Sequence, residues 1–356
     1  MQISHIRFWK EDLALSRPYT IAYKTIDAVE NVFLVLELSN GRMGIGAASP
    51  ADFVTGEEVA DTLEALETWA APLLEGQDIR DINGILGRAR AMLADRPAAL
   101  AAIDMALHDA LGHYLDRPVV QWLGQVRAGM PTSITIGIKD SIAEMLAEAE
   151  EYLSRGFKVI KLKIGLNPEQ DAEYFQALRR LAGPETTIRV DANQGYTPEG
   201  LLHFAEATRD ADVEFYEQPF PPNHLHWQRE LPTNLAALCA ADEDLLHYGH
   251  ALALCASPRS YGIFNIKLMK CGGIAEAMRI AEAAHRSGIT LMWGCNDESA
   301  ASIAAALHAA LASPATRYLD LDGSFDLAHD RVTGGFELRD GALYPAPGPG
   351  LGIQLC

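Results

Sequence analysis

KVIKLKIG, residues 158–165, decides the fold, because this stretch alternates aliphatic and cationic side chains. Successive side chains of a β-strand point to opposite faces, so the aliphatic residues share one face and Lys161 and Lys163 share the other. On an antiparallel sheet with one solvated face, both lysines would simply point into solvent. In a closed parallel barrel, helices cover the aliphatic face and the lysines point towards the barrel axis. The kind of sheet therefore determines whether these lysines have a function.

Seven more segments with the composition of β-strands lie at a nearly constant spacing along the chain. The eight predicted strands begin at Thr132, Val159, Thr187, Val213, Ala237, Gly262, Gly288 and Thr316. Neighbouring starts are 24 to 28 residues apart, and each interval has room for a helix. This alternation predicts an α/β fold, a (β/α)8 barrel of the TIM-barrel type. We then expect the two lysines inside the barrel, near the C-terminal end of their strand, where such barrels carry their active sites.

The segments before and after the barrel have a different pattern. Near the N-terminus, ISHIRFWKEDLAL and NVFLVLELSNGRMGIGAAS predict antiparallel strands with an Asn-Gly turn, and three helical stretches follow. We therefore predict an α+β capping domain over residues 1–125 and the barrel with the active site over residues 126–324. The tail, residues 325–356, has no place left in the ring. We expect it to pack back on the capping domain and complete it.

The composition excludes several classes of function. The 356 residues include 48 acidic and 29 basic residues, a net charge of −19, which disfavours nucleic acid and anionic membranes as partners. The five cysteines are scattered without a CxxC motif, so we expect neither a disulfide framework nor a zinc site. The N-terminus lacks the apolar segment of a secretory signal, and residues 299–313 are too few and too polar to cross a bilayer. We predict a cytoplasmic protein with a small-molecule partner, and assembly into a homo-oligomer stays open.

Polar side chains at the ends of other predicted strands repeat the pattern of the two lysines. Three strands carry two polar residues separated by an apolar one: Asp191 and Asn193, Asn265 and Lys267, Asp320 and Asp322. Two further strands end in Glu217 and Asp242. A single pair would fit a solvated surface. Four pairs at the ends of regularly spaced strands instead indicate a site inside the barrel.

Asp191, Glu217 and Asp242 end three consecutive strands, so we expect their carboxylates to converge. Converging carboxylates raise one another's pKa unless a cation neutralises them. Oxygen ligands with room for water suit Mg²⁺, and also Mn²⁺, whereas no histidine or cysteine joins the set to favour zinc. The sequence therefore predicts a site for a divalent cation.

Lys163 and Lys267 belong to the second and sixth strands, four positions apart in a ring of eight, so they are expected to face each other. A substrate carboxylate on the cation would hold its α-carbon between the two amines. This arrangement favours removal of the α-proton from one face and its return on the other, through an enediolate that the cation stabilises. A lysine base needs a pKa lowered from about 10.4 towards about 7–8. We expect Lys161 and the cation to supply the necessary repulsion.

Five motifs resemble those of the enolase superfamily, muconate-lactonizing subgroup: KLK at 161–163, RVDANQGY at 189–196, EQP at 217–219, ADE at 241–243 and NIKLMKCGG at 265–273. The resemblance extends over the whole chain, the capping domain included. It implies that Lys163 and Lys267 are the acid/base pair and that Lys161 lies beside the substrate carboxylate. It also implies Mg²⁺ on the three carboxylates, with Asn193 and Asn265 in supporting positions.

Within that subgroup, YLDLDGSFDL at 318–327 resembles the corresponding stretch of dipeptide epimerases, the L-Ala-D/L-Glu epimerase type included. The resemblance implies that Asp320 and Asp322 hold the α-ammonium group of a dipeptide whose C-terminal residue is epimerised. The alternatives within the subgroup are o-succinylbenzoate synthase, muconate cycloisomerase and N-acylamino acid racemase. A lyase or cycloisomerase needs no α-ammonium site. Outside the subgroup, a Schiff-base barrel has no use for the three carboxylates, and a binding protein does not need two opposed lysines.

The preference for a substrate side chain rests on two conflicting signals. Asp297 and Glu298 follow the seventh strand, next to the expected ammonium site, and suggest a basic side chain. Lys24 in the capping domain suggests an acidic one, as in an Ala-Glu enzyme. A buried contact between like charges costs more than a missing attraction, so the group that faces the cavity excludes the other class. We expect cationic dipeptides, or a broad range, in preference to acidic ones.

Overall fold

The computed structural model describes residues 1–21, 24–222 and 224–356, except for the side chains of Tyr19, Lys24 and Asp27. Eight parallel strands form one sheet in which each strand pairs with its neighbours in sequence. They are β5 (Ile134–Ile136), β6 (Val159–Lys163), β7 (Thr187–Asp191), β8 (Val213–Glu217), β9 (Cys239–Ala241), β10 (Ile263–Ile266), β11 (Thr290–Gly294) and β12 (Thr316–Asp320). The main-chain N–H of Ser133 donates to Leu319 O at 3.1 Å and brings the two outermost strands together. The predicted barrel is confirmed and nearly closed.

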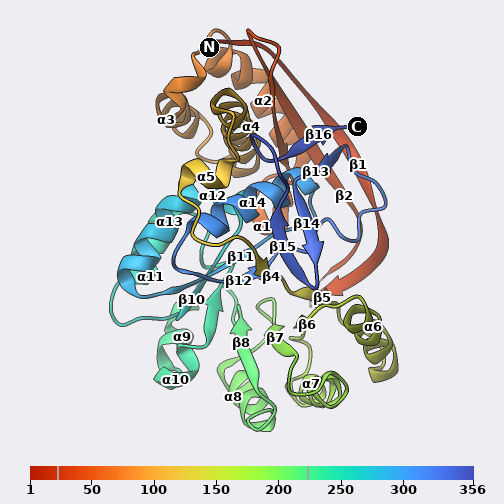
Figure 1. Ribbon diagram of the computed structural model, residues 1–356. Coiled ribbons are helices and arrows are strands. Elements are labelled where there is room, and N and C mark those ends of the chain that lie inside the picture. Colours follow the sequence, from red (N-terminus) through yellow and green to blue (C-terminus); the bar gives the residue numbers. More distant parts are fainter. Residues whose placement is uncertain (22–23, 223) are drawn as a thin grey trace.

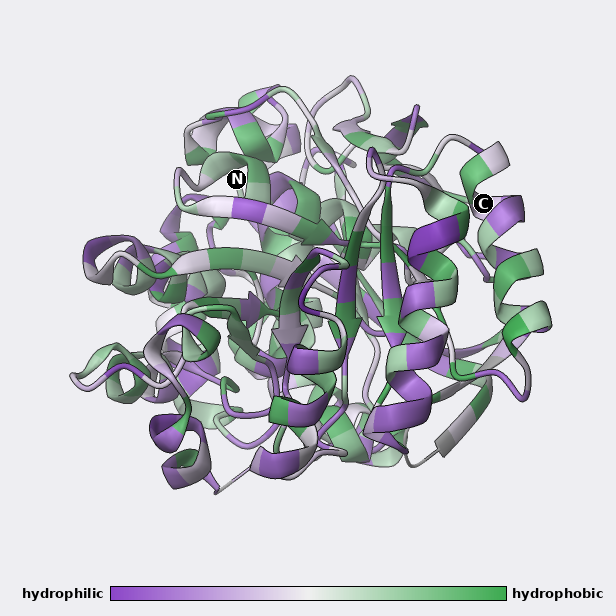
Figure 2. Cartoon of the chain, turned by 90° about the horizontal axis from the view of Figure 1, so that it is seen from below, coloured by the Kyte–Doolittle hydropathy of each residue, from purple (hydrophilic) through white to green (hydrophobic). Residues whose placement is uncertain are grey.

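Helices alternate with these strands and cover the outside of the barrel (Figure 1). They are α6 (Ile142–Ser154), α7 (Pro168–Ala182), α8 (Pro198–Ala207), α9 (Leu225–Glu230), α10 (Thr233–Ala236), α11 (Tyr248–Cys255), α12 (Leu268–Cys271), α13 (Ile274–Ser287) and α14 (Ala300–Ala312). Ser141 and Asn167 cap α6 and α7 by accepting hydrogen bonds from main-chain N–H groups in the first turn. Hydrophilic and hydrophobic residues mix along the outer helices (Figure 2), because one side packs on the strands. Within the described ranges, no helix has the length and apolar character needed to cross a membrane.

Side chains fill the barrel interior towards the N-terminal ends of its strands. Phe215, Ile263 and Met292 form a buried cluster there, and Tyr318 packs against it. The guanidinium carbon of Arg189 lies 4.9 Å from the ring centre of Phe215 and 5.2 Å from that of Tyr318. This packing closes one end of the barrel, so that an active site can form only at the C-terminal ends of the strands.

The capping domain joins an antiparallel sheet to a group of helices. The sheet consists of β1 (Ile3–Ile21), β2 (Lys24–Leu38) and β3 (Met43–Ala48), and the helices are α1 (Asp52–Thr55), α2 (Val59–Leu74), the 3-10 helix η1 (Ile79–Asp81), α3 (Ile82–Met92), α4 (Pro97–Leu115) and α5 (Val119–Leu123). The predicted Asn-Gly turn joins β2 to β3, with Gly41 at a φ of 79°. A side chain at Gly46 would collide with the main chain at Ala102, so glycine lets α4 lie directly on β3.

The β1–β2 hairpin is longer than the sequence predicts and extends from the capping helices to the barrel near β5 and α6 (Figure 1). Arg17 donates to Glu151 Oε2 at 2.7 Å and to the hydroxyl of Tyr152 at 3.2 Å, both on α6. The main-chain N–H of Ile138 donates to Thr20 O at 2.8 Å. The hairpin therefore bridges the capping domain and the barrel.

The C-terminal tail contacts both the capping domain and the barrel. Its strands are β13 (Val332–Gly334), which pairs with β16 (Ile353–Leu355), and β14 (Phe336–Arg339) and β15 (Ala342–Pro345), which form a sheet with β4 (Met130–Pro131). The N–H of Ser16 donates to Asp326 O at 2.7 Å, and that of Ala328 donates to Ala14 O at 2.8 Å. The division of the chain after residues 125 and 324 stays a prediction.

Candidate active site

A cavity of about 1020 Å³ lies between the capping domain and the C-terminal ends of the barrel strands. The hairpin contributes Arg17, Ile21 and Glu30 to its wall, and the loop after β3 together with the start of α1 contributes residues 49–54. Eight of the residues predicted from the sequence also line it: Lys161, Lys163, Asn193, Asp242, Lys267, Asp297, Asp320 and Asp322. The structure therefore brings most of the predicted site together in one cavity.

The three carboxylates predicted to bind metal lie on consecutive strands. Asp191 at the end of β7 is the direct strand partner of Glu217 at the end of β8, and Asp242 follows β9. All three are at most 2% exposed. Asn265 donates from Nδ2 to Glu217 Oε1 at 2.6 Å. Burial and the charges of Asp191 and Asp242 raise the pKa of Glu217 to about 8, so the acidic groups affect one another's ionisation.

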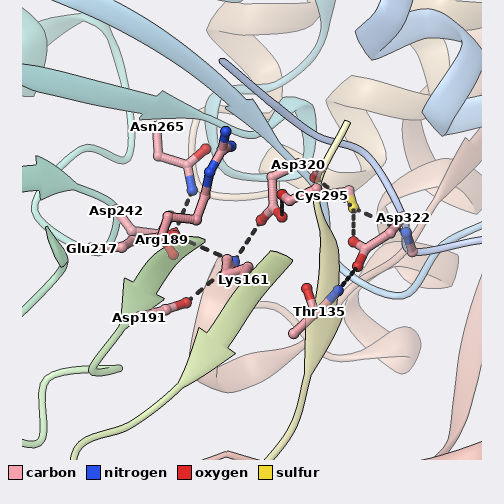
Figure 3. Close-up of polar contacts among 12 residues, drawn as sticks. Thr135, Lys161, Arg189, Asp191, Glu217, Asp242, Asn265, Cys295, Asp320 and Asp322 are labelled. Carbon is pink, nitrogen blue, oxygen red and sulfur yellow. Dashed lines mark hydrogen bonds and ion pairs between the residues drawn. The ribbon is translucent and has the colours of Figure 1, made fainter. Parts of the chain in front are cut away.

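Lys161 lies at the centre of these charged groups (Figure 3). Its Nζ is 3.2 Å from Glu217 Oε2 and 3.3 Å from Asp191 Oδ2, and it forms a closer ion pair with Asp320. Burial alone would lower the pKa of Lys161. The charges of the three carboxylates outweigh burial and hold this pKa well above its ordinary value. Lys161 therefore supplies a fixed positive charge inside the barrel.

Lys163 and Lys267 come from β6 and from the end of β10, four strands apart in the sheet. Lys163 Nζ lies 2.7 Å from Asp191 Oδ2 and 2.9 Å from Asn193 Oδ1, and Lys267 Nζ lies 2.9 Å from Asp242 Oδ2. Burial lowers the pKa of Lys267, but the charges of Asp242 and Glu217 raise it above its ordinary value. The pKa of Lys267 is therefore raised, whereas a lysine base needs a lowered pKa. It is raised because negatively charged carboxylates are the nearest neighbours of Lys267.

The chemistry of the carboxylates decides whether they fit a metal ion. Within the described residues, no three histidine, cysteine or acidic side chains lie together as a ready-made set of metal ligands, and the carboxylate oxygens contact lysines. The set itself fits a hard divalent cation, since it offers only oxygen, is buried and accumulates negative charge. A cation there would counteract the same charges that raise the pKa of Lys267.

The two aspartates at and just beyond the end of β12 have different partners (Figure 3). Asp320 pairs with Lys161 and accepts a hydrogen bond from Ser133 Oγ at 2.5 Å. Asp322 accepts a hydrogen bond from the N–H of Thr135 at 2.7 Å. Burial and the charge of Asp320 raise the pKa of Asp322 to about 7. Asp322 is therefore the better placed of the two to receive a cationic group, since Asp320 already has a lysine partner.

Three residues that contact Asp320 or Asp322 were missed by sequence reasoning: Ser133, Thr135 and Cys295. A signal for the first two was present, because they alternate with apolar residues in the first strand segment just as the recognised polar pairs do. The thiol of Cys295 lies 3.9 Å from Asp322 Oδ1 and accepts a hydrogen bond from the N–H of Gly323. No pattern in the sequence marks this cysteine.

One of the residues expected to select the substrate side chain lies on the cavity wall. Asp297 lines the cavity, and its main-chain oxygen accepts a hydrogen bond from Ser49 Oγ at 2.9 Å, which ties this loop to the capping domain. Glu298 is buried outside the cavity lining, and burial raises its pKa to about 8 against the opposing effect of Lys267. The side chain of Lys24 lies outside the described residues.

Comparisons with known proteins cover the whole length of the chain. Residues 4–124 match the family described as "Mandelate racemase / muconate lactonizing enzyme, N-terminal domain", and residues 144–356 match "Enolase C-terminal domain-like". The chain is 54% identical over 354 residues to the L-Lys-D/L-Arg epimerase of Desulforapulum autotrophicum and 48% identical over 353 residues to that of Methylococcus capsulatus, with 99% of each chain covered. The crystal structure of the dipeptide epimerase from Methylococcus capsulatus, complexed with Mg and the dipeptide L-Arg-D-Lys, matches with a TM-score of 0.97 at 48% identity over 99% of both chains.

Fold and site together define a capped barrel enzyme with acids and lysines at the strand ends. The chain belongs to the mandelate racemase/muconate lactonizing enzyme family of the enolase superfamily. The predicted resemblance to dipeptide epimerases is confirmed, and so is the prediction of an isomerase, since the most similar relatives above are named epimerases.

Proposed function

We propose that the protein is a dipeptide epimerase that inverts the α-carbon of the C-terminal residue of its substrate. The observation that carries this proposal is a single cavity with groups for a substrate carboxylate at one end and an acidic group for a substrate ammonium at the other. Strands β6 to β10 supply carboxylates and lysines that suit a substrate carboxylate held through a cation. Asp322, beyond β12, suits an ammonium group. A dipeptide carries both groups, one at each end, and the names of the similar enzymes support this assignment.

Asp191, Glu217 and Asp242 would hold Mg²⁺, and Mn²⁺ has the same preference for oxygen ligands. When bound, the cation would stabilise the negative charge that develops on the substrate carboxylate. Asn265 holds Glu217 Oε1 through its 2.6 Å hydrogen bond, and Glu217 Oε2 faces Lys161 Nζ at 3.2 Å. The Mg in the similar structure from Methylococcus capsulatus supports the assignment of Mg²⁺.

Lys163 and Lys267 would carry out the 1,1-proton transfer. One amine removes the α-proton from one face of the substrate, and the ammonium group of the other lysine returns a proton to the opposite face of the enediolate. Asn193 accepts a hydrogen bond from Lys163 and fixes the direction of its side chain. Lys161 adds positive charge beside the substrate carboxylate. Because the lysines stand four strands apart, both stereoisomers can be processed in one binding position.

We further propose that the substrates are dipeptides with cationic side chains. Asp297 is on the cavity wall, and the capping domain adds Asp52 and Glu58 to the lining. The described basic residues that line the cavity from the hairpin, Lys10 and Arg17, form ion pairs with Glu30 and Glu151. The relatives at 54% and 48% identity are named L-Lys-D/L-Arg epimerases, which supports the same class here.

A screen of dipeptides in D₂O tests the proposed reaction. Epimerisation through a proton transfer incorporates one deuterium at the inverted α-carbon, which mass spectrometry detects for every dipeptide in a mixture. We expect incorporation into dipeptides that carry Lys or Arg. Comparing kcat/KM for Ala-Glu, Ala-Leu and a Lys- or Arg-containing dipeptide at two salt concentrations ranks the classes, and a clear preference for Ala-Glu would contradict the cationic assignment.

Replacing Asp297 by Asn should lower kcat/KM for a Lys- or Arg-containing dipeptide by roughly 10- to 150-fold, the equivalent of one charge-assisted hydrogen bond of about 1.5–3 kcal/mol. Activity on Ala-Leu should change little, because that substrate has no cationic side chain. Asp95→Asn, which removes the same charge from an exposed position in the capping domain, is the matched control. An equal loss on both dipeptides would show that Asp297 does not select the side chain.

Replacing Asp322 by Asn should reduce kcat/KM for free dipeptides by a similar factor, because it removes the charged partner of the α-ammonium group. N-acetylated dipeptides should be poor substrates of the unmodified enzyme. With a pKa of about 7, Asp322 is mostly protonated at pH 6, whereas the α-ammonium group of the substrate loses its proton near a pKa of about 7.7–8.0. From pH 6 to 8, kcat/KM should therefore rise only about three- to fivefold, and Asp322→Asn should lose this rise. Equal rates on free and N-acetylated substrates would indicate an N-acylamino acid racemase instead.

A further inference from the structure

Lys270 is a buried lysine with no part in the proposed proton transfer. It lies on the short helix α12, which follows β10 and Lys267, and is 3% exposed. Its Nζ donates to Asp242 O at 2.6 Å, to Asn265 O at 3.1 Å, and to Asp242 Oδ1. An ammonium group has three donors and no acceptor, so these three contacts use its full capacity.

These contacts fix Asp242 from the side that faces away from the cavity. Lys270 holds both the main-chain carbonyl and Oδ1 of Asp242, and the main-chain N–H of Asp242 donates to Gln218 Oε1 at 2.9 Å. The remaining polar atom, Oδ2, contacts Lys267 at 2.9 Å, and Asp242 lines the cavity. The same ammonium group also connects the end of β9 with the end of β10, through Asn265 O.

We propose that Lys270 is a positioning residue that presets Asp242 as a ligand for the divalent cation. This inference rests on the proposed cation site. Groups behind a metal ligand fix its orientation, and their loss typically weakens metal binding 10- to 100-fold. Without Lys270, the carboxylate of Asp242 can rotate, and its oxygens no longer present one fixed position to the cavity.

The charge of Lys270 alone predicts the opposite result, which makes the inference testable. A buried ammonium group next to a cation ligand repels the cation, so removing the charge should tighten cation binding if charge were its only contribution. Removing the hydrogen bonds should weaken binding if Lys270 positions Asp242. Lys270→Met removes both the charge and the hydrogen bonds. Lys270→Gln removes the same charge but retains an amide donor on a shorter side chain.

The test is the affinity for Mg²⁺ of the unmodified chain, of both variants and of Lys158→Met, measured by calorimetry without dipeptide. Lys158 is an exposed lysine before the strand β6, so its replacement is a control for the change in net charge. We expect Lys270→Met to bind Mg²⁺ 10- to 100-fold more weakly, Lys270→Gln to lie between it and the unmodified chain, and Lys158→Met to remain unchanged. At saturating Mg²⁺, Lys270→Met should recover most of its kcat, because Lys270 does not touch the substrate.

Equal or tighter Mg²⁺ binding by Lys270→Met would overturn the positioning role. If that variant fails to fold in a thermal unfolding experiment, Lys270→Gln decides, and binding equal to or tighter than that of the unmodified chain overturns the role in the same way. Failure of the proposed function is distinguishable from failure of this inference. If the unmodified chain does not bind Mg²⁺, the cation site itself is wrong, whereas normal binding by the unmodified chain and by the variants contradicts Lys270 alone.

Discussion

Replacing Lys163 or Lys267 by alanine should slow epimerisation by at least about 10²–10⁴-fold, the contribution typical of a positioned general acid or base. Each replacement removes the only proposed proton carrier on one face of the substrate. The lysines lie on β6 and at the end of β10, four strands apart, so neither can take over the role of the other. The rate of epimerisation and the rate of deuterium incorporation at the α-carbon can be measured in one experiment in D₂O. The first reports the complete reaction, and the second reports proton exchange on the face that keeps its lysine.

The two variants should differ in the stereoisomer whose α-proton they still exchange. Lys163→Ala retains the amine on one face and should exchange the proton of the isomer that presents it there, and Lys267→Ala should exchange that of the other isomer. Lys158→Ala, at an exposed position before β6, is the matched control and should be fully active. Epimerisation at the unmodified rate by either active-site variant would disprove the opposed-base mechanism.

Removal of divalent cations should abolish activity, and added Mg²⁺ should restore it. The acids of β7, β8 and β9 are buried beside one another, and Lys161, the positive charge proposed to lie beside the substrate carboxylate, already pairs with Asp320. A bound cation is therefore needed to offset the negative charge that develops on the substrate carboxylate as it loses its α-proton. A bound cation supplies several kcal/mol of such stabilisation, which is a factor of roughly 10³ or more in rate. Activity is measured after exhaustive chelation, with the residual metal content determined by elemental analysis.

As a matched comparison, Mn²⁺ and Zn²⁺ are added separately to the metal-free enzyme. We expect Mn²⁺ to restore activity and Zn²⁺ not to, because the site offers oxygen ligands only. Addition of the chelator already saturated with Mg²⁺ controls for effects of the chelator itself. Full activity in a sample shown to be free of metal would require a different way to stabilise the developing charge, and we would then assign that role to Lys161.

The fold was predictable because polar and apolar residues alternate with period two while the strands recur every 24 to 28 residues. The same alternation identifies the residues at strand ends, and the structure places most of them in one cavity. Asp191 and Glu217, 26 positions apart in sequence, even become direct strand partners. Residues carried by regular strands are predictable, since the barrel geometry determines where they point.

Features that depend on contacts between loops and helices were not predictable. Lys270 lies on a short helix, and its role becomes visible only once its three hydrogen-bond acceptors are known. The predicted first strand ends at Leu15, whereas β1 continues through Ser16, Arg17 and Pro18 to Ile21, with an irregular register between Ala14 and Tyr19. Whether the pKa of Lys267 is raised or lowered depends on its distances to carboxylates from other strands, which the sequence does not give.

The contacts between the hairpin and the tail have a consequence for the order of events during synthesis. Ser16 and Asp326, which hold the hairpin to the tail, are 310 positions apart. At about 5–20 residues per second, the ribosome needs roughly 15–60 s to make the intervening chain. Throughout that time the hairpin lacks this tail partner, even though the helices of its own domain are already present. The contact between the hairpin and the tail can therefore form only after Lys163 and Lys267, the proposed acid/base pair, have been synthesised.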